Sequence, residues 1–173
     1  MADQNLIPFS DKYKRIATEE AWAPAELLKM YADLYNSKTF DDPGFDSLWG
    51  FYGTSMEPRP ATVRRKLADL DDERIADMDA AGIDFAILSL TSPGVQVFDR
   101  DTAVTLARDS NDMLKEAIDR HPDRYAGLCA IAPQAPELAA QELERCKNLG
   151  FRGIINNSHT FGEYLSDPKF WPI

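Results

Sequence analysis

The chain alternates short apolar segments with longer segments of helical periodicity, and it does so four times. The segments that read as strands are 13–21, 83–90, 125–131 and 151–156, and those that read as helices are 24–35, 62–81, 102–120 and 136–148. Segment 83–90 is apolar at nearly every position, which is typical of a parallel strand buried on both faces. Strands that alternate with helices predict a parallel sheet with right-handed crossovers.

The last residues carry the start of a further helix, with Asp167 as a candidate N-cap and Pro168 at the first helical position. A sheet that stopped here would leave an apolar edge strand open, and a complete barrel takes about 250 residues. We therefore expect an α/β fold, the N-terminal half of a (β/α)8 TIM barrel. Residues 1–173 would be part of one domain whose C-terminal strands are missing from this chain. The alternative is a self-contained flavodoxin-like open sheet, which should end on a finished helix.

Residues 36–60 read as a long loop inserted after the first strand and helix. Loops of this length without secondary structure are uncommon, and many are lids or binding loops. The aromatic content argues against disorder, because these side chains must pack on something. The large apolar side chains of the insertion are Phe40, Phe45, Leu48, Trp49, Phe51 and Tyr52. The insertion either packs on its own domain or covers a substrate or subunit contact.

Composition excludes some classes of function. The formal net charge of −10 argues against nucleic acid as a partner, because phosphates require a basic footprint. No apolar run is long enough to span a membrane, and residues 1–5 lack the features of a signal peptide. Cys129 and Cys146 suggest no disulfide framework, so we expect a cytoplasmic protein.

Candidate site residues follow from one rule: a parallel barrel carries its chemistry at the carboxyl ends of its strands. The first strand ends on Glu19 and Glu20. Side chains alternate along a strand, so one of the two points inward and the other toward the helices. Our central hypothesis is that Glu19 is a metal ligand. The alternative is that both acids only stabilise the start of the following helix through its dipole.

The other strands and the insertion supply polar candidates as well. They are Arg59, Thr91, Ser92, Gln96, Gln134, Asn156, Asn157 and His159. Arg59 either holds a substrate carboxylate in a bidentate contact or makes a surface ion pair. Thr91 is a pocket donor or a turn residue. His159 contacts substrate or acts as a general base, or it only orders its loop. His121 ends a helix, where a structural role is expected.

The candidate set suits a hard or borderline divalent cation held by oxygen ligands. The sequence has no zinc spacing of His and Glu, no Cys-x-x-Cys, no nucleophile elbow and no phosphate-binding glycine loop. One carboxylate cannot hold a metal tightly, so further ligands would have to lie beyond Ile173.

Five stretches carry a resemblance to a known family: 17–22, 71–83, 87–96, 121–125 and 164–171. Through them the chain resembles the amidohydrolase-superfamily branch of metal-dependent, non-oxidative decarboxylases related to aminocarboxymuconate-semialdehyde decarboxylase. In that branch the first strand carries Glu-x-Ala or Glu-x-His, and Glu19-Glu20-Ala21 fits the first form. The resemblance therefore implies that Glu19 binds the metal and that Ala21 does not.

The resemblance also implies an activity. It points to decarboxylation of a hydroxylated aromatic acid, with 5-carboxyvanillate converted to vanillate and carbon dioxide in the catabolism of lignin-derived compounds. Manganese is the expected metal and zinc its rival, and a homodimer is the expected assembly. Arg59 would orient an anionic group of the small aromatic substrate, and Thr91 or His159 would bind ring substituents. The other metal ligands, a His and an Asp, and the general acid Asp are expected beyond Ile173.

Two other functions remain open from the sequence. One is a metal-dependent hydrolase or hydratase that acts on a lactone or a ring-cleavage product, because fold alone does not choose the reaction. The other is a non-catalytic half-barrel that serves as a binding or assembly module.

Overall fold

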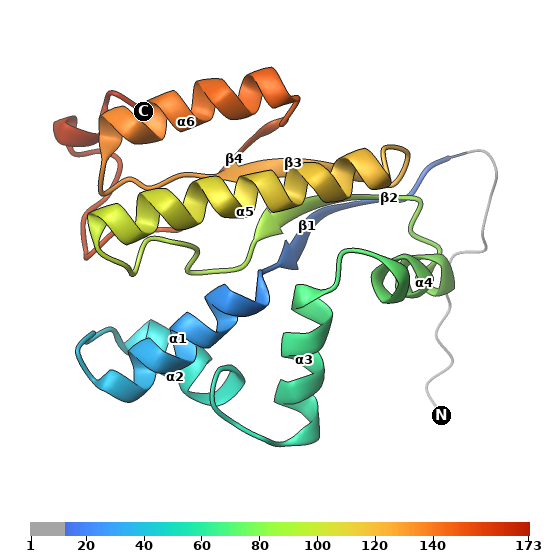
Figure 1. Ribbon diagram of the computed structural model, residues 1–173, viewed down its shortest axis with the longest axis horizontal. Helices are drawn as coiled ribbons and strands as arrows, with labels where there is room; N and C mark the ends of the chain where they lie inside the picture. Colours follow the sequence, from blue (N-terminus) through green and yellow to red (C-terminus); the bar gives the residue numbers. More distant parts are fainter. Residues whose placement is uncertain (1–12) are drawn as a thin grey trace.

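The computed structural model describes residues 13–173. Its strands are β1 (Ile16–Trp22), β2 (Phe85–Leu90), β3 (Tyr125–Ala130) and β4 (Gly153–Ile155). They form one parallel sheet in the order β1-β2-β3-β4 (Figure 1). A sheet in simple sequence order is the arrangement of a barrel, whereas a flavodoxin-like sheet reverses its order at a switch point. The predicted parallel α/β fold is confirmed, and the strand order argues against the open-sheet alternative.

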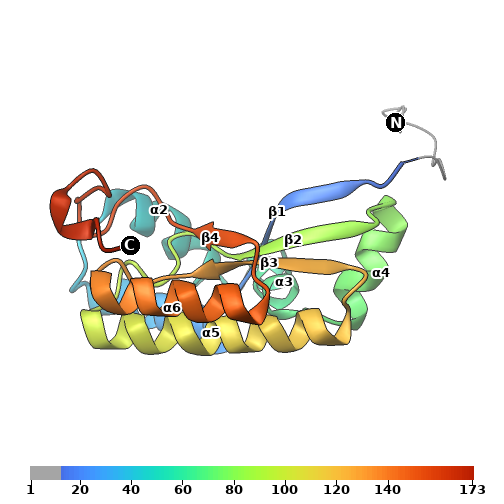
Figure 2. The same ribbon diagram turned by 90° about the horizontal axis from the view of Figure 1, so that it is seen from above.

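The helices give the sheet one covered face and one open face. They are α1 (Ala25–Ser37), α2 (Pro43–Tyr52), α3 (Pro58–Ala68), α4 (Asp72–Ala81), α5 (Arg100–Arg120) and α6 (Pro136–Leu149), followed by a short 3-10 turn, Pro168–Phe170. Figure 2 shows α5 and α6 lying side by side along one face of the sheet. Leu88 and Cys129, which point toward the helices, are fully buried. Ile87 and Leu128, on the opposite face, stay partly exposed within the described residues. We call this opposite face the inner face.

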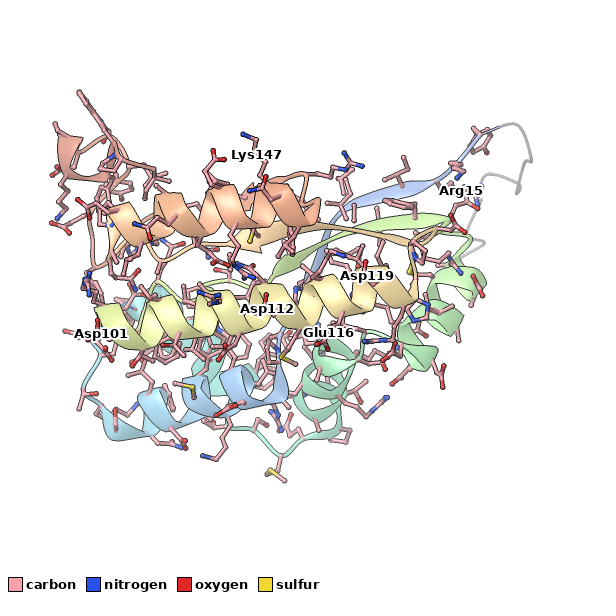
Figure 3. The ribbon with its side chains drawn as sticks, turned by 45° about the horizontal axis from the view of Figure 1, so that its top comes forward. Arg15, Asp101, Asp112, Glu116, Asp119 and Lys147 are labelled. Carbon is pink, nitrogen blue, oxygen red and sulfur yellow. The ribbon has the colours of Figure 1, made fainter. Side chains whose placement is uncertain are left out.

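The longest helix shows why the covered face is stable. α5 turns Ala103, Ala107, Leu114 and Ala117 toward the sheet, and all four are buried. Four of its five acidic residues, Asp101, Asp112, Glu116 and Asp119, follow one another along the helix in Figure 3. This division into an apolar stripe and a charged stripe is the amphipathic pattern of a helix that packs on a sheet.

The prediction of one long loop over 36–60 is wrong. The segment contains the whole of α2 and the first turn of α3. Asp42 caps α2 by accepting a hydrogen bond from Phe45 N at 2.7 Å, and Pro43 occupies the first helical position. Two of the segment's aromatic residues, Phe45 and Trp49, pack on their own domain and are 4% and 1% exposed, whereas Phe51 is exposed.

The prediction of one helix over 62–81 is also wrong, because the segment forms two helices, α3 and α4. Asp69 has extended backbone angles at the end of α3, and its side chain accepts a hydrogen bond from Arg74 N at 2.6 Å. Aspartate side chains compete with the helical hydrogen-bond pattern in this way. The apolar spacing continued across the break and concealed it.

Several predicted ends shift by a few residues. β1 begins at Ile16 and ends at Trp22 rather than spanning 13–21, and β4 is limited to Gly153–Ile155. α5 begins at Arg100 with Asp99 as its N-cap, so Asp101 and Thr102 lie inside the helix. The N-cap role of Asp167 is confirmed: its side chain accepts a hydrogen bond from Lys169 N.

An aromatic cluster fixes the inserted helices to the sheet. The ring of Tyr31 on α1 lies 4.4 Å from Trp49 and 5.8 Å from Phe98, centroid to centroid. The Tyr31 hydroxyl donates to Gly94 O at 2.6 Å, and Trp49 Nε1 donates to Ser92 O at 3.1 Å. Both acceptors lie in the loop after β2, so the insertion and this loop are held together.

Candidate active site at the carboxyl ends of the strands

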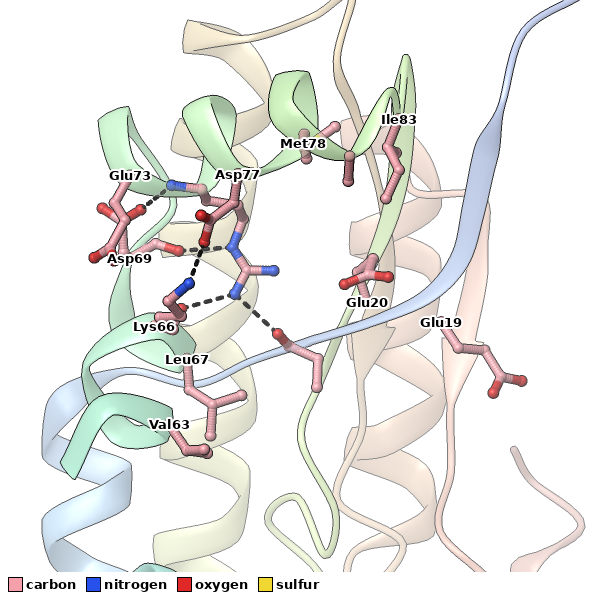
Figure 4. Close-up of a pocket in the computed structure, with 13 residues that line it drawn as sticks. Glu19, Glu20, Val63, Lys66, Leu67, Asp69, Glu73, Asp77, Met78 and Ile83 are labelled. Atoms are coloured by element: carbon pink, nitrogen blue, oxygen red, sulfur yellow. Dashed lines mark hydrogen bonds and ion pairs between the residues drawn. The ribbon is translucent and has the colours of Figure 1, made fainter. Parts of the chain in front are cut away.

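The two acids of β1 lie on opposite faces of the strand. Glu20 pairs with Leu88, and Ala21 pairs with Ser89. Paired residues of parallel strands point to the same face, so Glu20 shares the helix-covered face with Leu88. Glu19 and Ala21 therefore face the inner side, and Figure 4 shows the two carboxylates directed apart. The predicted alternation is confirmed.

Glu19 lies in a bulge of β1, together with Thr18. Between Ala17 and Glu20 the strand β1 advances three residues while β2 advances two, from Ala86 to Leu88. One extra residue of this kind changes the direction of the side chains at the bulge. The Glu19 carboxylate is exposed and makes no hydrogen bond or ion pair within residues 13–173. It is therefore free to bind a ligand from the open face.

Glu20 lies near a half-buried arginine instead. Arg74 of α4 donates hydrogen bonds to Ala21 O and Lys66 O, both at 3.0 Å, and to Asp69 O at 2.8 Å. Burial lowers the pKa of this guanidinium, and the negative charge of Glu20 is one of the groups that oppose the shift. A cavity of ≈ 530 Å³ between β1 and the helices α3 and α4 adjoins Arg74 (Figure 4). Glu19 and Glu20 both border this cavity, but most of its lining comes from α3 and α4, so we do not place the chemistry there.

The loop after β2 places Thr91 directly at the strand end. Its backbone N–H donates to Trp22 O at 2.8 Å, which prolongs the pairing of β1 and β2 by one bond. Thr91 O accepts from Gly94 N in a tight turn, and the Ser92–Pro93 peptide bond in this turn is cis. The Thr91 side chain is half-buried and makes no hydrogen bond within the described part of the chain.

Two glutamines hold the loops together through their side-chain amides, and Gln96 also lines a cavity beside His159. Gln96, 4% exposed, accepts from Asn157 N at 2.6 Å and donates to His159 O at 2.9 Å and Thr160 Oγ1 at 2.8 Å. Gln134, after β3, donates to Val95 O and Phe98 O. The loops after β2, β3 and β4 are thereby fixed to one another.

His159 lies at a cavity of ≈ 440 Å³ formed by the insertion and the loops after β2 and β4. Its Nε2 is 3.7 Å from Asp42 Oδ2, and its Nδ1 accepts from Gly162 N at 3.2 Å. Asp42 was not among the predicted site residues. Its Asp-Pro pair is the same N-cap signal as Asp167-Pro168, so the sequence did contain a clue to its position.

Three other predicted residues, Ser92, Gln96 and Asn157, line the same cavity, whereas Arg59, Thr91 and Gln134 do not. Arg59 is exposed on the first turn of α3 and makes no hydrogen bond or ion pair with any other described residue. Glu19 does not line the cavity beside His159. His121 pairs with Asp71, Nε2 to Oδ1 at 2.9 Å, at the end of α5, as its predicted structural role requires.

The described residues supply one candidate metal ligand but not a complete metal site. Among residues 13–173 no three His, Cys, Asp or Glu side chains cluster in a way that could hold a metal ion. The unpaired Glu19 carboxylate is the group that fits a divalent cation, since such cations prefer oxygen ligands. None of the helices within residues 13–173 has the length and apolar character needed to cross a membrane.

The chain is similar to several characterised proteins. The 5-carboxyvanillate decarboxylase from Novosphingobium aromaticivorans DSM 12444, solved with manganese and 4-hydroxy-3-methoxy-5-nitrobenzoic acid, is 50% identical with a TM-score of 0.89, covering 94% of this chain and 46% of that one. A γ-resorcylate decarboxylase from Polaromonas sp. (strain JS666) is 41% identical over 119 residues, 64% of this chain and 36% of the relative. A 2-keto-4-carboxy-3-hexenedioate hydratase from Sphingobium sp. (strain NBRC 103272 / SYK-6) is 34% identical over 101 residues, 52% of this chain and 29% of the relative.

These matches extend over most of this chain but only part of its relatives. The chain spans about half the length of the 5-carboxyvanillate decarboxylase structure. This coverage agrees with the partial barrel predicted from the sequence. The amidohydrolase family model matches residues 21–173. The chain belongs to the amidohydrolase family.

Proposed function

We propose that the protein that carries this chain is a metal-dependent, non-oxidative decarboxylase of hydroxylated aromatic acids, with 5-carboxyvanillate as its substrate. The observation that carries the proposal is the unpaired Glu19 carboxylate on the inner face of β1. It lies in a chain 50% identical to a manganese-containing 5-carboxyvanillate decarboxylase. Residues 1–173 are, in this proposal, the first part of a single barrel domain.

Glu19 is the proposed metal ligand, and manganese is the proposed metal, with zinc as the alternative. A bound divalent cation would supply a Lewis acid that polarises the substrate's oxygen atoms. Ala21 shares the inner face with Glu19 but has no ligating atom. The remaining ligands and the Asp that acts as general acid belong, in this proposal, to residues outside the 173 of this chain.

Three other residues are proposed to bind the small aromatic acid. Arg59 would pair with an anionic group, because guanidinium binds carboxylate in a two-bond geometry. The unpaired hydroxyl of Thr91 and the imidazole of His159 would hydrogen-bond ring substituents. The proposal also includes a homodimer, a role in the breakdown of lignin-derived aromatics and a cytoplasmic location. The proposed location rests on the two buried free cysteines.

The test compares Glu19→Gln with Glu20→Gln in the purified protein supplied with manganese. Both substitutions remove one carboxylate from neighbouring positions of one strand, but only Glu19 faces the inner side. We expect Glu19→Gln to lower manganese affinity more than about 100-fold, since loss of an outer-shell partner alone costs 10–100-fold. Release of carbon dioxide from 5-carboxyvanillate should fall with it, while Glu20→Gln keeps both. Stoichiometric metal in Glu19→Gln would refute the assignment.

A hydratase is the second candidate, because the chain is also 34% identical to the Sphingobium hydratase. The two reactions differ in their products. A decarboxylase releases one carbon dioxide for each 5-carboxyvanillate or γ-resorcylate consumed, whereas a hydratase adds water to an unsaturated oxo acid and releases no gas. Assaying both substrate classes with one preparation separates them.

A further inference from the structure

A second group of polar residues lies apart from Glu19, in the ≈ 440 Å³ cavity between the insertion and the loops after β2 and β4. This volume is within the range of small-molecule sites. Its walls include Phe40, Phe45 and Phe161, and the Phe40 ring meets the other two edge to face, with centroids 5.3 Å and 6.1 Å away. Aromatic walls in this arrangement suit a flat aromatic ligand.

The contacts of His159 determine which of its ring nitrogens carries the proton. The backbone N–H of Gly162 can only donate, so Nδ1 of His159, 3.2 Å away, must be the acceptor. The proton of the neutral ring is therefore on Nε2. Nε2 lies 3.7 Å from Oδ2 of Asp42, beyond hydrogen-bonding range.

Both partners are held in place by other contacts. Gln96 accepts from Asn157 N and donates to His159 O, and so fixes the loop that carries the imidazole. Asp42 uses Oδ1 to cap α2, which leaves Oδ2 free to face the histidine. The side chains of His159 and Asp42 are 36% and 23% exposed, so a ligand in the cavity can reach both.

We propose that Asp42 and His159 form a subsite for a ring hydroxyl of an aromatic ligand. A hydroxyl oxygen about 2.8 Å from each atom fits across the gap between them. It would donate its proton to Asp42 Oδ2 and accept one from His159 Nε2–H, which satisfies all three groups. A carboxylate in the same place would have no proton to give and would be repelled by Asp42. The ligand class rests on the proposed function, but the geometry of the pair does not.

The test measures binding of vanillate and 3-methoxybenzoate, two ligands that differ by one ring hydroxyl. Calorimetry on the purified protein with manganese gives the ratio of their dissociation constants for the wild type and for Asp42→Asn. Asparagine keeps the helix cap, because it caps as well as aspartate, but it removes the charged acceptor. The matched control is Asp99→Asn, which makes the same exchange at the N-cap of α5.

We expect wild type to favour vanillate and Asp42→Asn to reduce this preference about tenfold, the usual worth of a hydrogen bond to a charged group. His159→Gln should reduce it similarly, and Asp99→Asn should leave it unchanged. Any contact between the hydroxyl and the metal cancels, because it is common to all four proteins.

Two results would overturn the subsite. Equal weakening of both ligands by Asp42→Asn would mean that the pair only clasps the insertion to its neighbouring loop. Failure of the wild type to distinguish the two ligands would have the same consequence. Carbon dioxide release by the wild type is measured separately. If the wild type releases carbon dioxide but does not discriminate between the ligands, the proposed function stands and the subsite is refuted. If it discriminates but releases no carbon dioxide, the subsite stands and the proposed function is refuted.

Discussion

Replacing Asn111 by alanine should be among the most destabilising polar substitutions in this chain. Asn111 on α5 is 1% exposed, and its side chain bonds to both backbone groups of Ala130 at the end of β3. Its Nδ2 donates to Ala130 O at 2.9 Å, and its Oδ1 accepts from Ala130 N at 2.8 Å. Nδ2 also donates to Glu142 Oε1 at 2.8 Å. The substitution leaves two buried backbone groups without these partners, at about 1–3 kcal/mol each, so we expect a loss of about 3 kcal/mol.

Urea unfolding measures this loss directly. With a denaturant dependence of about 2 kcal/mol per molar urea, the midpoint should fall by about 1.5 M. The control is Asn148→Ala, which makes the same exchange at an exposed position near the end of α6. It should change the midpoint little, because surface substitutions usually stay within about 0.5 kcal/mol. A shift for Asn111→Ala no larger than that of the control would refute the reasoning.

Two further predictions concern the covered face and the helix ends. In Gly127→Ala, the new Cβ would lie 2.9–3.0 Å from side-chain atoms of Phe151, Ile118 and Leu114, so thermal unfolding should show a cost of about 1–3 kcal/mol. Gly153→Ala, with its nearest atom at 3.3 Å, should cost less, and equal costs would contradict the packing argument. The hydrogen bond from Arg120 and the partner His121 hold the pKa of the Asp71 carboxyl below its ordinary 3.8. A carboxyl whose pKa is lower in the folded than in the unfolded state stabilises the folded protein at pH values above the unfolded-state pKa. This stabilisation is lost as the pH falls through the folded-state pKa. The wild type should therefore melt on the order of 2 °C above Asp71→Asn at pH 6, and the difference should vanish well below pH 3.8; a constant difference would contradict the assignment.

The parts of the fold that follow from local periodicity were predictable. The four strands and the helices α1, α5 and α6 were predictable because each carries its own apolar pattern, a short apolar run for a strand and a period near 3.6 for a helix. The alternation of side chains along a strand predicted that Glu19 and Glu20 point to opposite faces. The register with Leu88 then shows which face each occupies, something that strand pairing alone can supply.

The predictions failed where a single side-chain contact outweighed the local sequence pattern. The segment 36–60 was read as a loop because Asp, Gly and Ser interrupt it, yet the Asp42-Pro43 pair starts a helix there. The break in 62–81 was missed because the apolar spacing ran on, whereas the Asp69 side chain takes over the N–H of Arg74. In both places one aspartate side chain decided the structure, and an apolar pattern does not record such a contact.

The candidate site was harder to predict than the fold, because its contacts join residues far apart in the sequence. Gln96 and Gln134 were singled out because polar residues after parallel strands tend to face a site. Instead, Gln96 reaches 61 positions along the chain to Asn157, and Gln134 reaches 39 positions back to Val95. Gln96 uses both amide atoms and Gln134 uses its amide nitrogen to fix loops, so their residue type alone gave no sign of the role. Gln96 fixes the loop that carries His159, and His159 lines one cavity with Asp42. The ligand-discrimination assay on Asp42→Asn therefore tests a property that residue type and spacing did not predict.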